Sequence, residues 1–308
     1  MASISKADVA ASSSPSPSWS QVAEAQKKVD ELSKQVLALP IADLRAIKYR
    51  PAALPEDIPQ PGIDIDISTI EVPVRDGAKI PLRVYRAKAA SANQLPDSDG
   101  AVLFFNIHGG GWVLGVPETE EAQNRIIAVR NKAVVVSVDY RKAPEFPFPV
   151  PLDDSYDVLQ WCRQKENAVS LGVDANKIVI GGGSAGANLT AAITLRARAH
   201  DNLSGIVGQI LNIPVTCHPQ YFPSERYSHL SWSQNAEAPV VDAARMIWFW
   251  NHYLSASGVE AAADPSLSPL LASKEALEGL PPALVQVAGM DPLRDEGLAY
   301  AEALGASG

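Results

Sequence analysis

The chain has 308 residues, of which 46% are hydrophobic and 20% are charged. This is an ordinary globular composition, and it allows one sizeable α/β core with a small cap. The formal net charge of −9 argues against nucleic acid or an anionic membrane as a main partner.

Residues 1–14 have no continuous apolar stretch of the kind found in a signal peptide, and no segment is long enough for a membrane helix. A cytoplasmic protein without stable membrane insertion is therefore expected. Cys162 and Cys217 lie in unrelated segments and are expected to be buried reduced thiols. The five histidines form no metal-ligand cluster, so neither a metal nor another cofactor is predicted.

The N-terminal region precedes the core. Residues 1–18 are rich in Ser, Ala and Pro and are predicted to be disordered. Residues 19–39 carry apolar side chains with the spacing of one helix face, at Val22, Ala25, Val29, Leu32, Val36 and Leu39. Pro40 ends this helix, and the five prolines of residues 40–62 predict an irregular tether. Residues 19–62 are thus expected to form a cap helix and its tether.

A domain of alternating strands and helices is predicted over residues 63–308. Two runs, 65–74 and 79–86, flank Asp76-Gly77, a sequence typical of a β-hairpin. Short apolar runs then alternate with helical segments, at 101–107, 133–138, 177–180, 206–212 and 283–287. This order predicts a mostly parallel sheet with helices on both faces.

The pentapeptide Gly182-Gly183-Ser184-Ala185-Gly186 follows an apolar run and precedes a helix-like stretch. In this strand–turn–helix context, a G-x-S-x-G serine projects its hydroxyl out of the sheet. Glycines on both sides permit the strained turn and a close approach of neighbouring elements. Ser184 is therefore the candidate nucleophile.

A second glycine-rich turn lies upstream. The predicted strand 101–107 runs into His108-Gly109-Gly110-Gly111-Trp112. Successive glycines leave backbone N–H groups free to point into a cavity, as an oxyanion hole requires. An HGGG-type turn of this kind forms part of the oxyanion hole in lipases and esterases. Upstream of a well-placed G-x-S-x-G, the turn is interpreted in the same way here.

Residues 214–258 interrupt the alternation of strands and helices. They end in a helix-like run, 240–253, which contains Trp248, Phe249 and Trp250. These aromatic residues are expected either to pack in the core or to line a pocket, and one helix can do both with different faces.

The motifs together resemble the hormone-sensitive-lipase branch of the α/β-hydrolase family. Beyond the two glycine turns, three segments are similar to family motifs: Asp139-Tyr140-Arg141-Lys142-Ala143-Pro144-Glu145, Asp264 to Leu270, and Asp291 to Gly297. The similarity runs from about residue 60 to the last residue, in the family's order. The resemblance implies an α/β-hydrolase sheet, with a cap formed by the N-terminal helix and an insertion at about 214–258.

The resemblance also implies roles for individual residues. Ser184 would attack an ester carbonyl, and the backbone N–H groups of Gly110, Gly111 and Ala185 would hold the oxyanion. Asp291 would orient a histidine and stabilise its charged form. Supporting rather than catalytic roles are expected for His108, Asp139, Arg141 and Glu145, and helix-terminus charge for Asp295 and Glu296.

A catalytic histidine is missing from the expected position. In this fold the triad follows the order Ser, acid, His, yet no histidine follows Asp291. His200, His218, His229 and His252 all precede it, and none occupies the family's position. The last strand, the last helix and the base are therefore expected to be absent from this chain, through truncation or as a natural short form.

The leading hypothesis is a serine carboxylesterase that acts on short-to-medium acyl or aryl esters as small-molecule substrates. One alternative is a ligand-binding receptor, as in the plant gibberellin receptors, which resemble the family. Others are a secondary-metabolism cyclase or lyase, and an inactive truncated esterase. A homodimer is left open.

Overall fold

The computed structural model describes residues 17–47, 54–88, 100–200 and 203–308. Most of the segment predicted to be disordered lies outside these residues, and its end belongs to a short 3-10 helix, Pro17–Gln21. Within the described residues, seven strands form one sheet in the order β1-β2-β4-β3-β5-β6-β7. The strands are β1 (Ile65–Pro73), β2 (Lys79–Ala87), β3 (Ala101–Ile107), β4 (Val134–Val138), β5 (Val173–Gly183), β6 (Ile206–Asn212) and β7 (Ala283–Gln286).

Strands β1 and β2 form the predicted antiparallel hairpin, with Ile65 opposite Ala87. Strand β2 also runs antiparallel to β4, and all further pairs in the sheet are parallel. The prediction of a mostly parallel α/β sheet with an antiparallel start is confirmed. Because β5, β6 and β7 are parallel neighbours, the loops after them leave the sheet at the same edge.

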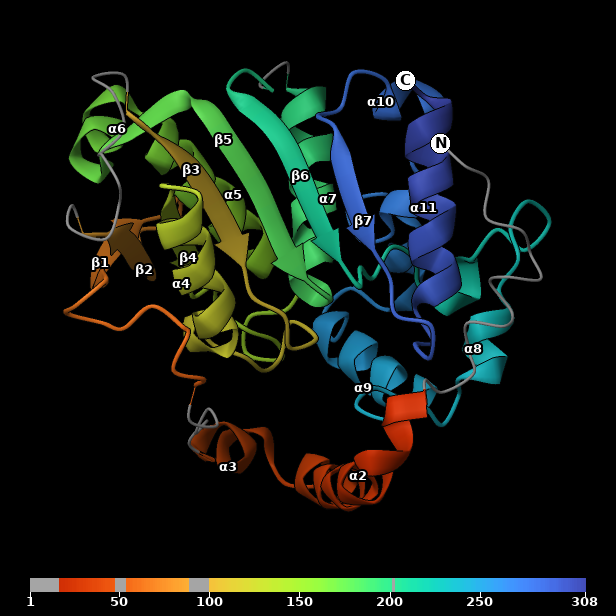
Figure 1. Ribbon diagram of the computed structural model, residues 1–308. Coiled ribbons are helices and arrows are strands. Elements are labelled where there is room, and N and C mark those ends of the chain that lie inside the picture. The colour runs from red at the N-terminus through yellow and green to blue at the C-terminus, as the bar shows by residue number, and fades with distance from the viewer. Residues whose placement is uncertain (1–16, 48–53, 89–99, 201–202) are drawn as a thin grey trace.

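Helices cover both faces of the sheet (Figure 1). Helix α4 (Glu121–Arg130) packs on one face, where Ala128 joins a cluster with Val135 of β4. The opposite face packs against α5 (Val150–Arg163) and α7 (Ala185–Ala199). Neighbouring residues of β4 enter different clusters because strand side chains alternate between the two faces. The other α-helices that follow β3 in the chain are α6 (Lys165–Leu171), α8 (Leu230–Gln234), α9 (Ala243–Tyr253), α10 (Lys274–Leu277) and α11 (Arg294–Ala306).

The N-terminal region forms a separate helical layer next to α9 (Figure 1). Its main helix, α2 (Ala23–Leu37), falls within the predicted helical segment. The prediction of an irregular tether was wrong for part of residues 40–62, because a short helix, α3 (Ile41–Ala46), begins directly after Pro40. Proline fits this position, since its fixed φ and missing N–H do not disturb the start of a helix.

Strand β7 lies at the edge of the sheet within the described residues. Leu284 of this strand is 61% exposed. Cys162 and Cys217 are both free and buried, as predicted, and burial raises the pKa of both thiols.

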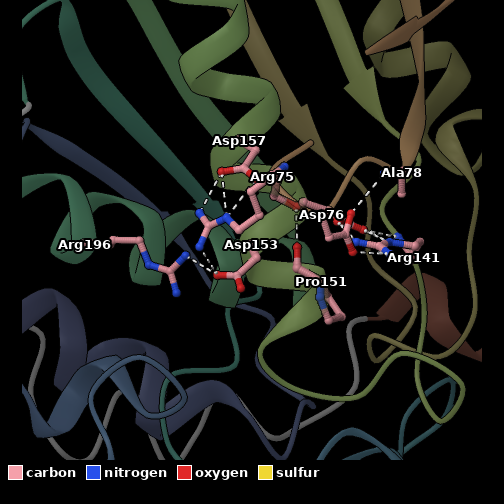
Figure 2. A network of polar contacts seen from close by, with 10 residues as sticks. Arg75, Asp76, Ala78, Arg141, Pro151, Asp153, Asp157 and Arg196 are labelled. Atoms are coloured by element: carbon pink, nitrogen blue, oxygen red, sulfur yellow. Dashed lines mark hydrogen bonds and ion pairs between the residues drawn. The ribbon is translucent and has the colours of Figure 1, made fainter. Parts of the chain in front are cut away.

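A polar network connects the β1–β2 turn to helices α5 and α7 (Figure 2). Arg141 donates its backbone N–H and two side-chain N–H groups to Asp154, which is only 1% exposed. Arg141 also pairs with Asp76 in the turn at 2.8 Å. The other ion pairs are Arg75–Asp153, Arg75–Asp157 and Arg196–Asp153. Arg141 thus braces loops, as predicted.

Replacing Asp154 with Ala tests this network. We expect the free energy of unfolding to fall by about 2–4 kcal/mol, because the change leaves the partly buried Arg141 without its main acceptor. Urea denaturation measures the loss. Asp76→Ala is the matched control, since Asp76 is the half-exposed partner of the same arginine and should matter much less. Equal losses in both variants would contradict the expectation.

Candidate functional site

Ser184 lies on a tight turn between β5 and α7, as the sequence predicts. Its backbone has φ 53° and ψ −115°, a conformation that non-glycine residues rarely adopt. The Ser184 N–H donates to the carbonyl of Asn212, the last residue of β6, at 2.9 Å. This strained strand-to-helix turn is the geometry that exposes a nucleophile above an α/β-hydrolase sheet.

Two glycines of the turn are required by close packing. A Cβ on Gly186 would lie 1.9 Å from the carbonyl oxygen of Ile107, and a Cβ on Gly182 would lie 2.4 Å from the same atom. No side chain fits there without moving backbone. The end of β3 therefore lies directly against the Ser184 turn, and so does the loop that follows β3.

That loop is the HGGG segment. Gly110 and Gly111 have φ of 116° and 61°, so both occupy the region that favours glycine. The ring of Phe249 from α9 packs on Gly111, where a Cβ would lie 2.1 Å from a ring carbon. Ala185 is the first residue of α7, so its N–H is one of the four that lack an acceptor within the helix.

Neighbouring side chains hold the loop in place. The His108 Nδ1–H donates to the carbonyl of Gly109 at 2.7 Å, and the His108 ring stacks on Tyr140 at 4.4 Å between centroids. Burial lowers the pKa of His108 to about 3, so this histidine is neutral. The Tyr140 hydroxyl donates to the carbonyl of His108 at 3.0 Å. His108 thus has the supporting role that the sequence predicts.

A cavity of about 570 Å³ opens next to Ser184. Ser184, Gly110 and Gly111 all line it, so the structure brings these predicted residues together. Most of its other lining residues are apolar. Several of these come from α2, α9 and the segment before α9, among them Val29, Leu32, Val36, Val240, Met246 and Phe249. Two residues with charged side chains also line it, Glu120 and Arg245.

Helix α9 serves both purposes considered for its aromatic residues. Met246 and Phe249 line the cavity, and they also belong to the main core cluster. Trp250 and Tyr253 are buried on the core side, where the Tyr253 ring stacks on Trp112 at 4.4 Å between centroids. The helix therefore joins the cavity to the core.

Polar contacts attach α2 and α3 to the rest of the molecule. Asp30 of α2 accepts the Val240 N–H at 3.0 Å. Arg45 of α3 contacts three groups on two loops of the α/β domain: the carbonyl oxygens of Val113 and Ala143 at 3.0 and 2.5 Å, and the Glu145 carboxylate at 2.7 Å. No pattern in the sequence indicates this role for Arg45. Its contact with Glu145 agrees with the supporting role predicted for that residue.

Asp291 lies in the loop after β7. Its carboxylate accepts the Leu293 N–H at 2.8 Å, and its carbonyl accepts from the Asn235 amide at 3.0 Å. Burial raises the pKa of Asp291 to about 6, although the bond from Leu293 lowers it. Asp291 follows β7, which is two places from β5 in the sheet. Because these strands are parallel, Asp291 and Ser184 both lie beyond the carboxyl ends of their strands. It is not among the residues that line the cavity.

The prediction for Asp295 and Glu296 was incomplete. Both lie in the first turn of α11, where acidic groups are favourable, but both are buried and bonded to other segments. Asp295 accepts the Ser231 N–H at 2.8 Å, and Glu296 accepts the Thr216 N–H at 2.7 Å. These carboxylates hold the segments after β6. The motif at 264–270 has a related role, because Asn188 of α7 donates to the Leu267 carbonyl at 2.8 Å.

Among the described residues, none of the five histidines lines the cavity. His218 accepts the Gln220 N–H, and its ring packs on Trp250 at 5.1 Å. His229 stacks on Phe222 at 3.9 Å. His252 bonds to the carbonyl of Trp248, and His200 contacts the Tyr156 hydroxyl. No described group of His, Cys, Asp and Glu has an arrangement that could hold a metal ion.

Comparison with known proteins agrees with this geometry. Residues 104–308 match the family of proteins with an α/β-hydrolase fold. The chain belongs to the α/β-hydrolase family. It is 35% identical to the carboxylic ester hydrolase LipN of Mycobacterium tuberculosis over 266 residues, 86% of this chain and 66% of LipN. The chain thus spans slightly less than two thirds of the length of that relative.

Solved structures of other α/β hydrolases are also similar. A fungal esterase structure from Rhizomucor miehei superimposes with a TM-score of 0.76 at 33% identity, and covers 88% of this chain and 79% of its own. The crystal structure of vibralactone cyclase superimposes with a TM-score of 0.74 at 29% identity, over 88% of this chain and 78% of its own. The predicted fold is confirmed.

Asp291→Asn tests how much the charge of Asp291, in the loop after β7, lowers the stability of the fold. Because the folded-state pKa is raised, the native state binds the extra proton, and stability falls as the pH rises from about 4 to about 6. Asn keeps the acceptor for Leu293 and carries no charge. We expect the variant to be more stable at about pH 7.5 by about 1–3 kcal/mol and similar to the parent at about pH 4. Urea denaturation at both pH values checks this, and a loss of stability at neutral pH would contradict it.

Proposed function

We propose that this protein is a serine carboxylesterase that hydrolyses short-to-medium acyl or aryl esters. One observation carries the proposal: Ser184, on a strained turn at φ 53°, shares an apolar cavity with the backbone of Gly110 and Gly111. A nucleophile next to bare backbone donors is the arrangement needed for acyl transfer. The similarity to LipN and to the Rhizomucor miehei esterase supports this reaction class.

In the proposed mechanism, the Ser184 hydroxyl attacks the ester carbonyl and forms a tetrahedral intermediate. The backbone N–H groups of Gly110, Gly111 and Ala185 stabilise its oxyanion, and each such donor typically contributes about 3 kcal/mol. Loss of the alcohol leaves an acyl-enzyme on Ser184. Water then attacks this ester, and the carboxylic acid is released as the serine is regenerated.

Each step also needs a base to accept the serine or water proton. In a Ser–His–acid triad, the acid orients the histidine, and we assign this acid role to Asp291. No histidine follows Asp291 in the sequence, and none lines the cavity within the described residues. Turnover by this chain should therefore be low, at the level that the oxyanion hole and substrate binding sustain without the full triad.

Residues 19–62 and 214–258 would act as a cap that binds the apolar part of the substrate. Side chains of both α2 and α9 line the cavity, which supports this role. Val29 and Leu32 of α2 line the cavity yet remain 54% and 60% exposed. A bound acyl or aryl group would cover them, and burying this surface is favourable.

Covalent labelling of Ser184 is the test of the proposed function. A fluorophosphonate probe should label the peptide that contains Ser184, and Ser184→Ala should abolish both the label and the slow hydrolysis of p-nitrophenyl butyrate. Ser233→Ala is the matched control, because Ser233 is exposed on the short helix α8. Imidazole should accelerate hydrolysis more in the parent chain than in Ser184→Ala, because it can replace the base.

Equal hydrolysis by the parent and Ser184→Ala, with and without imidazole, would rule out the esterase proposal. Binding of esters without any turnover or label would favour a receptor. Rates ordinary for an esterase, about 1–10³ per second without imidazole, would show that another side chain of this chain is the base.

Similarity to vibralactone cyclase supports a second candidate, in which a hydroxyl of the acyl group itself attacks the acyl-enzyme. An apolar substrate that covers Val29 and Leu32 would favour this outcome, because it would limit the access of water to the acyl-enzyme. Incubation with esters of hydroxy acids separates the two functions. A cyclase releases a lactone, which is lighter than the free acid by one water. We expect the acid to predominate, and a predominant lactone would reverse the assignment.

No helix among the described residues is long and apolar enough to cross a membrane. We propose a cytoplasmic location, which the two free, buried cysteines support. A homodimer stays a prediction.

A further inference from the structure

The carboxyl group of Glu120 lies where three parts of the proposed active site meet. Glu120 is the last residue of a short 3-10 helix, Pro117–Glu120, which lies directly before α4. One carboxylate oxygen, Oε2, accepts from the amide of Asn106 in β3 at 2.7 Å. The other, Oε1, accepts the N–H of Gly109 at 3.3 Å. The same Oε1 is 2.9 Å from the position that a Cβ on Gly183 would occupy.

Glu120 therefore fills the space beside Gly183 and also holds the first glycine of the HGGG loop. Gly109 has no side chain of its own to fix its orientation. It is held at its carbonyl by His108 and at its N–H by Glu120. The peptide planes that follow belong to Gly110 and Gly111, whose positive φ angles permit many other orientations. Fixing Gly109 limits where their N–H groups can point.

The surroundings of Glu120 are unfavourable for an acidic side chain. This is a second reason to assign Glu120 a functional role. Burial raises the pKa of Glu120, and the N–H groups of Asn106 and Gly109 only partly offset this. Among the described residues, no cationic group forms an ion pair with it. A carboxyl that is partly removed from water and has no cationic partner is costly. Such costs concentrate at functional sites.

We propose that Glu120 is a positioning residue for the oxyanion hole. Its carboxylate holds Gly109 so that the N–H groups of Gly110 and Gly111 converge on the space above Ser184. The same carboxylate also packs against Gly183 of the Ser184 turn. The inference rests on the proposed acyl-transfer function. This role requires a side chain long enough to bring an acceptor oxygen to the Gly109 N–H, and it does not require a negative charge.

Two conservative variants separate the effect of side-chain length from the effect of charge. Glu120→Gln keeps the length and an acceptor oxygen for Gly109, and the Asn106 amide can turn its own oxygen toward the new NH₂ group. Glu120→Asp keeps the charge but is shorter by one methylene. Glu118→Ala is the control, because Glu118 lies in the same 3-10 helix and its carboxylate pairs with Arg83 instead.

Hydrogen exchange of the peptide that covers residues 104–116 reports on the hold on Gly109, and the rate of fluorophosphonate labelling reports on the site. We expect Glu120→Asp to speed amide exchange by about three- to tenfold, the value of one hydrogen bond. We expect it to slow labelling of Ser184 by roughly ten- to a hundredfold through misplaced donors. Glu120→Gln and Glu118→Ala should stay within about threefold of the parent in both measurements.

The proposal is overturned if Glu120→Asp matches the parent in either measurement, or if Glu120→Gln is as impaired as Glu120→Asp, which would indicate a role for charge. Urea denaturation of each variant separates these effects from a general loss of stability. If Ser184 of the parent is not labelled at all, the esterase function itself fails. In that case, unchanged amide exchange in Glu120→Asp still contradicts the proposal that Glu120 fixes Gly109. Faster amide exchange then confirms only that Glu120 fixes Gly109.

Discussion

The close contact between the end of β3 and the start of α7 is the constraint on which the site depends. The Ile107 carbonyl lies so near the Ser184 turn that Gly182 and Gly186 cannot carry a side chain. Because these elements approach so closely, the loop after β3 has to pass beside Ser184. The nucleophile and its candidate oxyanion donors are thus brought together by backbone packing, before any side chain of the loop contributes.

Acidic side chains that are at least partly buried hold several of the segments that follow the strands. Glu120 holds the loop after β3, and Glu296 holds the segment after β6 through Thr216. Burial raises the pKa of both carboxyls, and that of Asp291 as well. Each group costs stability where an uncharged residue would cost less. Proteins commonly accept such costs where they position catalytic groups.

The N-terminal helical layer is attached to the α/β domain on a different physical basis from the packing inside that domain. Helix α2 keeps Val29 and Leu32 largely exposed, so apolar burial attaches it only in part. Individual polar contacts supply the rest, notably the three that Arg45 makes with two loops of the domain. One of these loops is the HGGG loop, which Arg45 contacts at Val113. The helical layer that lines the cavity and the loop beside Ser184 are therefore in direct contact.

Sequence patterns were enough to predict the strands, the hairpin, the α2 helix, the Ser184 turn and the glycine loop. Each of these depends on local periodicity or on glycines at particular positions. The sequence did not reveal α3, the positions of Arg45 and Glu120, or the bonds that Asp295 and Glu296 make. Several of their partners lie far away in the chain, among them Ser231 for Asp295 and Thr216 for Glu296. An isolated Arg or Glu shows no pattern that separates it from a solvated surface residue. Only tertiary packing decided these contacts, because burial removes such groups from water and requires each to find a hydrogen-bond partner.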